Sequence, residues 1–250
     1  STNLDCRQDG AKLHPQFGRA SYILNAGIAG IEEADSLLII GANPRKEAPI
    51  LNARIRKRWL RGDFKVSLIG EKADLTYAYD YLGAGTDTLA EFVRNAAADK
   101  AKPMILIGQG ALTRPDGEAI LSMAAKAAQL SGAATVGGWA GFGVLHTAAA
   151  RVGGLDLGFV PGEGGLDVSG MLSPGALDVL FLLGADEIEV PPGAFVIYQG
   201  THGDRGAHRA DVILPGAAYT EKSGTYVNTE GRVQMTDRAT FPPGDAREDW

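Results

Sequence analysis

The sequence predicts a doubly wound α/β fold with mostly parallel sheets. Two observations lead to this prediction: short apolar runs alternate with longer stretches of helical periodicity, and most of the runs end in a glycine-containing turn. Runs without polar alternation are typical of strands buried on both faces of a parallel sheet. Four such buried strands are expected, at Ser36–Ile40, Lys65–Ile69, Pro103–Ile107 and Val179–Leu183. Two further strands are expected at Phe195–Tyr198 and Asp211–Leu214.

Helices are expected between the strands. Pro49 suits the first turn of a helix that Gly62 ends. Leu51, Ile55 and Trp59 form an apolar stripe at positions i, i+4 and i+8 of this helix. Three further helices are expected at Thr88–Ala98, Asp116–Leu130 and Gly143–Val152.

A change in composition divides the chain. Glycine or proline fills ten of the 23 positions in residues 153–175, which indicates a loop. We therefore expect a first Rossmann-like α/β lobe over residues 1–152, a connection over residues 153–175, and part of a second α/β lobe over residues 176–250. This second lobe is expected to be truncated at the C-terminus, because Ala246–Trp250 resembles the first turn of a helix.

Composition excludes several classes of protein. The net charge of −6 does not provide the basic surface that nucleic acid requires. The single cysteine, Cys6, excludes a disulfide framework and any cluster held by several cysteines of this chain, so no metal site is expected in it. No apolar run approaches the roughly 20 residues of a membrane-spanning helix, so no direct membrane insertion is expected. The polar start shows no signal peptide, and a cytoplasmic location is expected.

Glycines mark the ends of the predicted strands. Ligands of open parallel sheets bind beyond the carboxyl ends of the strands, so these turns either cradle a nucleotide or simply allow tight connections. Neither the dinucleotide fingerprint nor the P-loop pattern is present, which favours tight connections. The glycines are Gly41, Gly70, Gly108, Gly184 and Gly200.

Two segments carry a resemblance to a known family. Glu33–Arg45 is a strand ending in G-x-N-P, and residues 210–232 combine A-D-V-x-L-P with E-x-x-G-T-x-x-N-x-E-G-R. Both resemble signatures of the molybdopterin oxidoreductase superfamily. Within it, the sequence is most similar to the family of the large iron–sulfur subunit (the G subunit) of respiratory NADH–quinone oxidoreductase (complex I). The segments that carry this closer similarity are 47–57, 74–80, 198–204, 214–232 and 246–250.

The resemblance implies two related α/β lobes of the formate dehydrogenase and nitrate reductase type, whose strand-end loops hold a pterin–guanine dinucleotide in the parent enzymes. It also implies that the large iron–sulfur subunit keeps this fold without the molybdenum cofactor, and that its iron–sulfur clusters lie in an N-terminal region outside these residues. Cys6 does not have the setting of the metal-ligating residue of the parent enzymes. The positions expected to be vestiges of the dinucleotide site are Gly41, Asn43, Pro44, Gly184, Asp186, Asn228, Glu230 and Arg232.

Four groups of polar residues have both a structural and a functional interpretation. Asn43 either ties down its loop or bonds a base or phosphate. In an extended segment Asn228, Glu230 and Arg232 would point the same way, toward a ligand or into a Glu230–Arg232 network, and the network is favoured.

The basic helix residues at 54–61 either face solvent or contact an acidic partner subunit or a phosphate. His202 and His208 flank Asp204, a combination that can bind a metal, although loop histidines are mostly not ligands.

The resemblance implies a scaffold region within the peripheral arm of NADH–quinone oxidoreductase, with no redox centre, catalytic residue or bound cofactor of its own. Its partners would be other peripheral-arm subunits of complex I. It would lie peripherally on the cytoplasmic side of the inner membrane, or on the matrix side in mitochondria. The alternatives are a fragment of an active molybdopterin-dependent oxidoreductase, and a nucleotide-binding module.

Overall fold

The computed structural model describes residues 1–135, 137–149, 151–203 and 205–250. The chain folds into two compact units. The five-stranded unit comprises Ala11–Val152 together with Asn228–Arg232. The three-stranded unit comprises Ser1–Gly10, Gly153–Val227 and Val233–Trp250.

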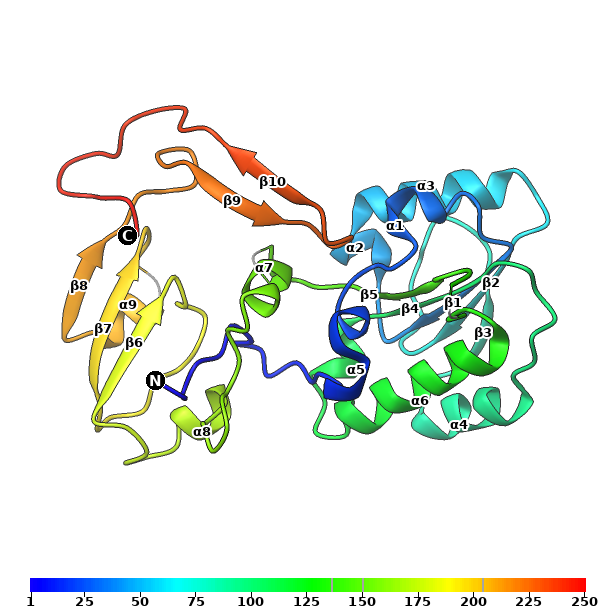
Figure 1. The fold of residues 1–250 in the computed structure, drawn as a ribbon, viewed down its shortest axis with the longest axis horizontal. Helices are drawn as coiled ribbons and strands as arrows, with labels where there is room; N and C mark the ends of the chain where they lie inside the picture. Colours follow the sequence, from blue (N-terminus) through cyan, green and yellow to red (C-terminus); the bar gives the residue numbers. More distant parts are fainter. Residues whose placement is uncertain (136, 150, 204) are drawn as a thin grey trace. The chain divides into compact units, whose positions relative to one another are not determined.

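The five-stranded unit contains a wholly parallel sheet with the strand order β3-β2-β1-β4-β5 (Figure 1). The first strands run outward from β1 to β3, and the chain then returns to place β4 on the other side of β1. This reversal beside β1 is the topological switch point of a doubly wound fold. The strands are β1 (Ser36–Ile40), β2 (Lys65–Ile69), β3 (Asp80–Gly83), β4 (Pro103–Ile107) and β5 (Phe142–Val144).

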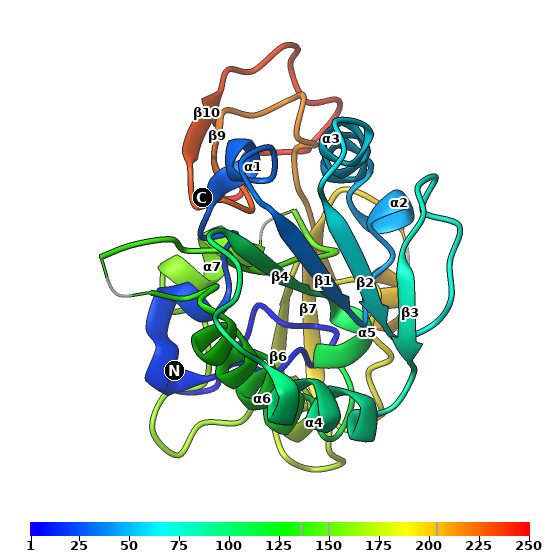
Figure 2. The same cartoon turned by 90° about the vertical axis from the view of Figure 1, so that its right-hand side faces the viewer.

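Helices cover both faces of this sheet (Figure 2). Leu37 and Ile39 of β1 pack in one core cluster with Leu51 and Ile55 of α3. The alternate residues of β1 pack in a second cluster with residues of α4 and α6. The helices of this unit are the 3-10 helix η1 (Pro15–Ser21), α1 (Gly27–Gly30), α2 (Pro44–Glu47), α3 (Pro49–Leu60), α4 (Thr86–Asn95), α5 (Gln109–Leu112) and α6 (Gly117–Ser131).

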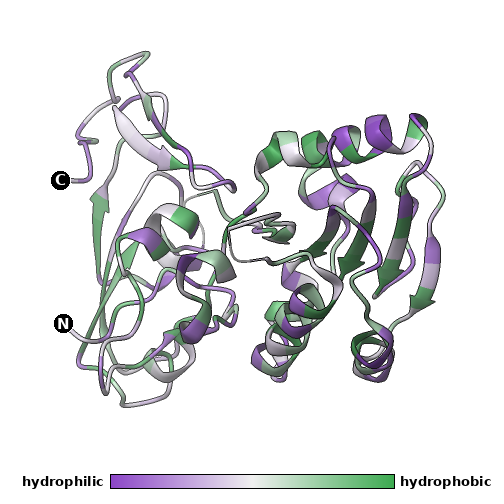
Figure 3. Cartoon of the chain, turned by 45° about the vertical axis from the view of Figure 1, so that its right-hand side comes forward, coloured by the Kyte–Doolittle hydropathy of each residue, from purple (hydrophilic) through white to green (hydrophobic). Residues whose placement is uncertain are grey.

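The three-stranded unit contains a parallel sheet in the order β6-β7-β8 and an antiparallel hairpin. The strands of the parallel sheet are coloured mostly as hydrophobic in Figure 3. The parallel strands are β6 (Val179–Leu183), β7 (Phe195–Gly200) and β8 (Val212–Pro215), and the hairpin strands are β9 (Gly224–Val227) and β10 (Val233–Thr236). The remaining helices are α7 (Arg151–Asp156), α8 (Val168–Met171) and α9 (Arg205–Arg209).

The predicted fold class is confirmed, because the sheets are mostly parallel and the larger one is doubly wound. All four strands expected to be buried form at the predicted residues, as β1, β2, β4 and β6. One part of that prediction is wrong: β6 is not buried on both faces, because its side chains alternate between buried and exposed. The division at residues 152, 153–175 and 176–250 stays a prediction.

Two expected helices are wrong. The expected helix Gly143–Val152 contains the end of the short strand β5 and the start of α7, with residue 150 outside the described part. The strand β5 is not evident from the sequence because its central residue is Gly143, and glycine is depleted in strands. Glycine is needed at this position, since a Cβ would lie 2.5 Å from the Leu24 side chain. Residues 246–250 form no helical turn either, because Arg247 instead forms a parallel bridge to Gly216. The sequence also did not reveal β3, a short and mostly exposed edge strand.

Candidate functional site

The five-stranded unit has a cleft of about 930 Å³ at the carboxyl ends of its strands. This is the edge at which open parallel sheets bind their ligands. Mixed polar and apolar residues from four connections line it. They are residues 40–43 and 45–47 after β1, residues 69–74 after β2, residues 84–86 and Leu89 after β3, and Gly110, Ala111, Arg114 and Ile120 after β4.

Close packing of two loops forms one wall of the cleft beside the switch point. Gly41 has a φ of +55°, and a Cβ there would lie 2.6 Å from the Cβ of Ala111. A Cβ on Gly110 would lie 2.8 Å from the carbonyl oxygen of Gly41, and one on Gly108 would lie 2.5 Å from the Cβ of Ala42. The loops after β1 and β4 therefore touch so closely that not even a methyl group fits between them.

Four backbone N–H groups around the cleft are engaged with protein acceptors. The N–H groups of Gly41, Gly70 and Gly108 donate to carbonyl oxygens at 2.9, 2.9 and 3.0 Å. The N–H of Asn43 donates to Oε1 of Glu47 at 2.6 Å. A phosphate at this edge would need such N–H groups as donors, and these four already have acceptors.

Asn43 and Glu47 leave two acceptor atoms unpaired. Asn43 precedes α2 as its N-cap, yet its side chain makes no capping hydrogen bond. Glu47 instead reaches back to the Asn43 N–H, as the acidic residue of a capping box does. In the described part of the chain, Asn43 Oδ1 and Glu47 Oε2 are buried and have no hydrogen-bond donor. Both residues line the cleft, and these two oxygens are buried in its wall.

Two of the four cations that line the cleft form ion pairs. Arg45 binds Asp74, and the pKa of Asp74 lies below its ordinary value because the Thr76 N–H and then Arg45 donate to the carboxylate. Arg114 binds Asp116 at 2.7 Å.

The remaining charges do not make the cleft strongly positive. Lys72 lies 4.6 Å from the centre of the Tyr81 ring. Lys46 adds a further positive charge, and Glu71 and Glu47 oppose it.

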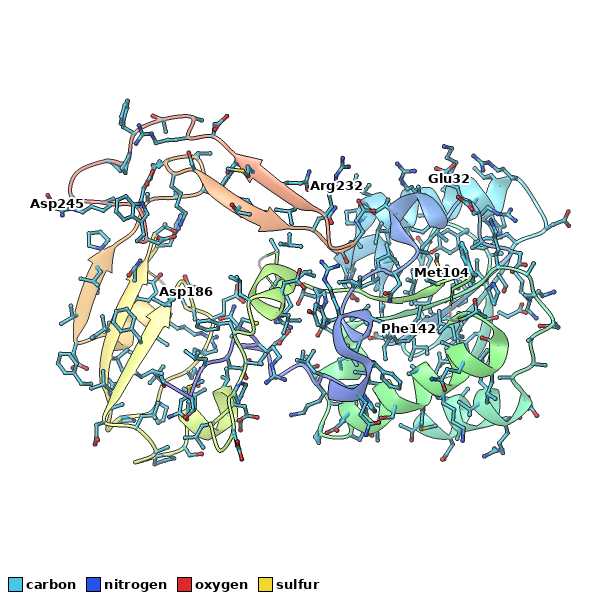
Figure 4. The ribbon with its side chains drawn as sticks, viewed as in Figure 1. Glu32, Met104, Phe142, Asp186, Arg232 and Asp245 are labelled. Carbon is cyan, nitrogen blue, oxygen red and sulfur yellow. The ribbon has the colours of Figure 1, made fainter. Side chains whose placement is uncertain are left out.

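The predicted vestigial residues are divided between the two units; of those labelled in Figure 4, Asp186 belongs to the three-stranded unit and Arg232 to the five-stranded unit. Gly41 and Asn43 line the cleft, and Pro44 is buried at the start of α2 without lining it. Gly184 and Asp186 belong to the three-stranded unit, where the Gly184 N–H donates to Gln199 O at 2.7 Å and the Tyr198 hydroxyl donates to Asp186 Oδ2 at 3.4 Å. The residues Asn228, Glu230 and Arg232 lie in the turn between β9 and β10, and none of them lines the cleft.

The turn at residues 228–232 corrects two predictions. The segment is not extended there, because Gly231 has a φ of +79° and its N–H donates to Asn228 O. Glu230 accepts from the Ile28 N–H at 2.7 Å and from Asn228 Nδ2 at 3.2 Å. Among the described residues Glu230 and Arg232 form no direct ion pair, but the charge of Arg232 contributes to the lowering of the Glu230 pKa, so the expected network exists with Ile28 and Asn228 as its hydrogen-bonding members. The Ile28 N–H is the main reason why the pKa of Glu230 lies below its ordinary value, with burial acting in the opposite direction.

The basic residues of α3 are bound within the five-stranded unit. Arg54, Lys57 and Arg61 all bind Glu32, at 2.8, 3.0 and 2.7 Å (Figure 4). Hydrogen bonds from Lys57 and then Arg61 lower the pKa of Glu32, although some desolvation opposes them. The other two cations of the helix, Arg56 and Arg58, donate to backbone carbonyl oxygens. The density of positive charge in this helix is therefore explained by contacts inside the protein, which the sequence did not indicate.

The segment that contains His202 and His208 shows no metal-binding geometry among its described residues. Asp204, one of the three residues considered there, lies outside the described residues. Nδ1 of His202 lies 2.7 Å from Oγ1 of Thr201. Over the ranges that the structure describes, no three His, Cys, Asp or Glu side chains are grouped so that they could hold a metal ion. Within those same ranges, no helix is both long and apolar enough to cross a membrane.

Comparison with known proteins gives a consistent family. The sequence profile of the family described as molybdopterin oxidoreductase matches residues 1–250. The chain is 46% identical over 239 residues to the mitochondrial NADH-ubiquinone oxidoreductase 78 kDa subunit of Candida albicans, covering 93% of the chain and 32% of that protein. The same subunit of Neurospora crassa is 44% identical over 241 residues, with the same coverages.

A protein from a third organism agrees. The NADH-ubiquinone oxidoreductase 75 kDa subunit of Reclinomonas americana is 45% identical over 257 residues, covering 99% of the chain and 37% of that protein. The chain therefore spans about a third of the length of these curated relatives.

Proposed function

The chain belongs to the molybdopterin oxidoreductase family, and we propose that it is a scaffold region in the peripheral arm of an NADH–quinone oxidoreductase, without a redox centre of its own. The named relatives, which are NADH-ubiquinone oxidoreductase subunits, support this proposal. As part of such an enzyme it serves electron transfer from NADH to quinone by holding other parts in place. Its partners are other peripheral-arm subunits, on the cytoplasmic or matrix side of the membrane.

The observation that carries the proposal is the internal pairing of hydrogen-bond donors around the cleft. A pterin–guanine dinucleotide is a diphosphate, and it needs backbone N–H groups and cations that are free to bind it. Here the N–H groups of Gly41, Gly70, Gly108 and Asn43 already have protein acceptors. The Asn43 N–H donates to the carboxylate of Glu47 and is therefore not available to donate to a phosphate oxygen. This pairing supports the proposal that these residues no longer hold the cofactor of the family.

The cysteine content supports the same proposal for iron–sulfur chemistry. Iron–sulfur clusters of the ordinary kinds are held by several cysteine thiolates, and Cys6 is the only cysteine in these 250 residues. Clusters of the whole subunit, which the family resemblance implies, would be held by cysteines outside residues 1–250.

The test separates the amount of enzyme from its turnover. In the full-length subunit, a scaffold role predicts that Asn43→Ala leaves the NADH–quinone reductase rate per assembled complex unchanged. Leu68→Asp, in the core of the sheet where Leu68 is fully buried, should lower the amount of assembled complex but not the rate of what assembles. A lower rate per complex in Asn43→Ala, with normal assembly, would overturn the proposal. Molybdenum or tungsten in stoichiometric amount would favour an active molybdopterin enzyme instead.

The two unpaired acceptors of the cleft favour a second candidate, a nucleotide-binding module. Asn43 Oδ1 and Glu47 Oε2 could accept hydrogen bonds from the amino and imino groups of a base. Calorimetry with GMP and GDP distinguishes the two functions. Binding tighter than about 10 μM, on the order of −7 kcal/mol, that is lost in Asn43→Ala would establish the binding module. The scaffold role predicts no such binding.

A further inference from the structure

Within the described residues of the three-stranded unit, one face of the β6-β7-β8 sheet has no covering layer. Leu180 and Leu182 are buried with the corresponding residues of β7 in a core cluster that includes Ala207 of α9. The opposite face leaves large apolar side chains about half exposed. They are Val179 (54%), Phe181 (49%), Leu183 (56%), Phe195 (47%), Val212 (39%) and Leu214 (41%).

These exposed residues form one continuous surface. Val179 is paired in register with Phe195, and the strand neighbours of β7 and β8 are aligned in the same way, so the six side chains point to the same side. Parallel sheets occur almost only with both faces covered, and an apolar surface of this kind marks an interaction site. In addition, β6 is an edge strand among the described residues, with one row of backbone groups unpaired by any strand.

The five-stranded unit shows how such a face is covered in this protein. There β1, β2 and β3 run outward, as β6, β7 and β8 do here, and α3 covers one face. The chain then returns through α4 to place β4 beside β1, and α4 and α6 cover the other face. The rule that parallel crossovers are right-handed requires this, because reversing the direction of travel along the sheet moves the helix to the opposite face.

We propose that a helix–strand unit of the same polypeptide, outside residues 1–250, completes the smaller sheet. Its strand pairs in parallel with the free edge of β6, and the apolar side of its helix covers Val179, Phe181 and Leu183. The relatives are about three times as long as this chain, which supplies the polypeptide. The helix belongs on the open face because a return from β8 past β6 reverses the direction of travel.

Residues 247–249 are positioned to lead into this helix. Gln199 lies on the open face, in register with Leu183, and its Nε2 donates to the carbonyl oxygen of Asp249 at 2.8 Å. Arg247 bridges to Gly216, immediately after β8. Residues 247–249 are thus held at the carboxyl edge of this sheet, where a helix of a right-handed crossover begins. The helix then runs antiparallel to β6 across the open face.

Photo-crosslinking in the full-length subunit tests the proposal. A benzoylphenylalanine side chain is placed singly at Val179, Phe181 or Leu183, and the crosslinked peptides are identified by mass spectrometry. Because Val179 and Leu183 are about 13 Å apart along the strand and a helix rises about 1.5 Å per residue, the two sites should crosslink to one helix. The residue reached from Val179 should lie roughly nine positions later than that reached from Leu183.

The control is the same side chain at Leu157, which is also in the three-stranded unit and is 87% exposed. Crosslinks from β6 to a segment of the same polypeptide outside residues 1–250, in the order given above, are expected, with none from Leu157. Crosslinks to another subunit, or to a second copy identified by mixing isotopically heavy and light chains, would overturn the proposal. So would a yield from β6 no higher than that from Leu157. Because each site is read separately, a failure to fold at one of them leaves the other two informative.

Discussion

The carboxylate of Glu47 accepts a hydrogen bond of 2.6 Å from the backbone N–H of Asn43, four residues earlier. The bond closes the loop that connects β1 to α3 through the single turn of α2. It also uses a donor that a bound anion at the carboxyl edge of the sheet would require. In this protein, the loop is therefore held by a negative charge of its own.

Glu47→Ala is expected to destabilise the protein by about 0.5–2 kcal/mol, the range for loss of a helix N-terminal cap. The reason is that the Asn43 N–H loses its acceptor. Urea unfolding measures the change. Glu71→Ala is the matched control, since Glu71 is an exposed carboxylate of the same cleft. Equal effects of the two substitutions would show that the hydrogen bond contributes nothing and that only charge matters.

Gly41→Ala is expected to be more costly than Gly62→Ala. Both glycines have positive φ, which costs an L-residue about 1–2 kcal/mol. Only Gly41 also faces a neighbour, Ala111, at 2.6 Å from the added Cβ, and nothing lies within 4 Å of a Cβ at Gly62. Overpacking should add about 1–3 kcal/mol at Gly41.

The steric part of the Gly41→Ala effect should be recovered when Ala111→Gly is added, with stability measured by thermal and urea unfolding. If the double variant is no more stable than Gly41→Ala alone, the contact between the two loops is not the cause.

Glu230 should contribute to stability in a pH-dependent way. Its pKa is lower in the folded protein than in the unfolded chain. Its contribution is therefore fully present above the ordinary glutamate pKa of about 4.3, and it disappears as the pH falls through the lower folded value. Glu230→Gln should lower stability at neutral pH and make the loss of stability in acid less steep.

The test for Glu230 is the urea concentration at the midpoint of unfolding, measured across the acid pH range. Glu91→Gln, at an exposed carboxylate of α4, serves as the control and should leave the acid profile unchanged. A Glu230→Gln profile parallel to that of the unmodified protein would contradict the assignment.

Tyr77→Phe is expected to destabilise the five-stranded unit by about 1–3 kcal/mol, the cost of an unsatisfied buried acceptor. The Tyr77 hydroxyl donates to Oδ1 of Asn52 at 2.8 Å, and both residues are buried. Burial also raises the pKa of Tyr77 above its ordinary value. Tyr81→Phe, at a residue that is 38% exposed, should change the free energy of unfolding little, and a similar loss there would point to a general effect of the removed hydroxyl.

The purified chain of 250 residues is expected to be colourless. Iron–sulfur clusters absorb visible light and need several cysteine ligands, whereas only Cys6 is present. An absorption spectrum taken after extensive dialysis is sufficient. A visible band that persists would contradict the proposal that this region holds no redox centre.

The strand positions could be predicted from the sequence because each strand has its own local pattern of apolar residues. In β1 and β4 every residue or nearly every residue is apolar, and this pattern follows from burial on both faces, whichever strands lie beside them. The glycines at the strand ends were predicted to allow tight connections. Gly41 is packed against Ala111, and Gly108 against Ala42. The family was identifiable for a different reason, since its motifs at Glu33–Arg45 and residues 210–232 are contiguous in the chain.

The tertiary structure decided which of these residues meet. Asn43 and Glu230 belong to motifs that suggested one site, yet Asn43 lines the cleft while Glu230 binds the backbone of Ile28. Glu32 binds Arg54 and Lys57 of α3 and Arg61 at its C-terminal end, three cations for which the sequence indicated no partner. Val179–Leu183 reads as a strand buried on both faces, but only one face of β6 is covered. Local sequence patterns indicate the periodicity and burial of single strands and helices. The neighbours of each side chain depend on the crossover connections, which bring together residues that are distant in sequence.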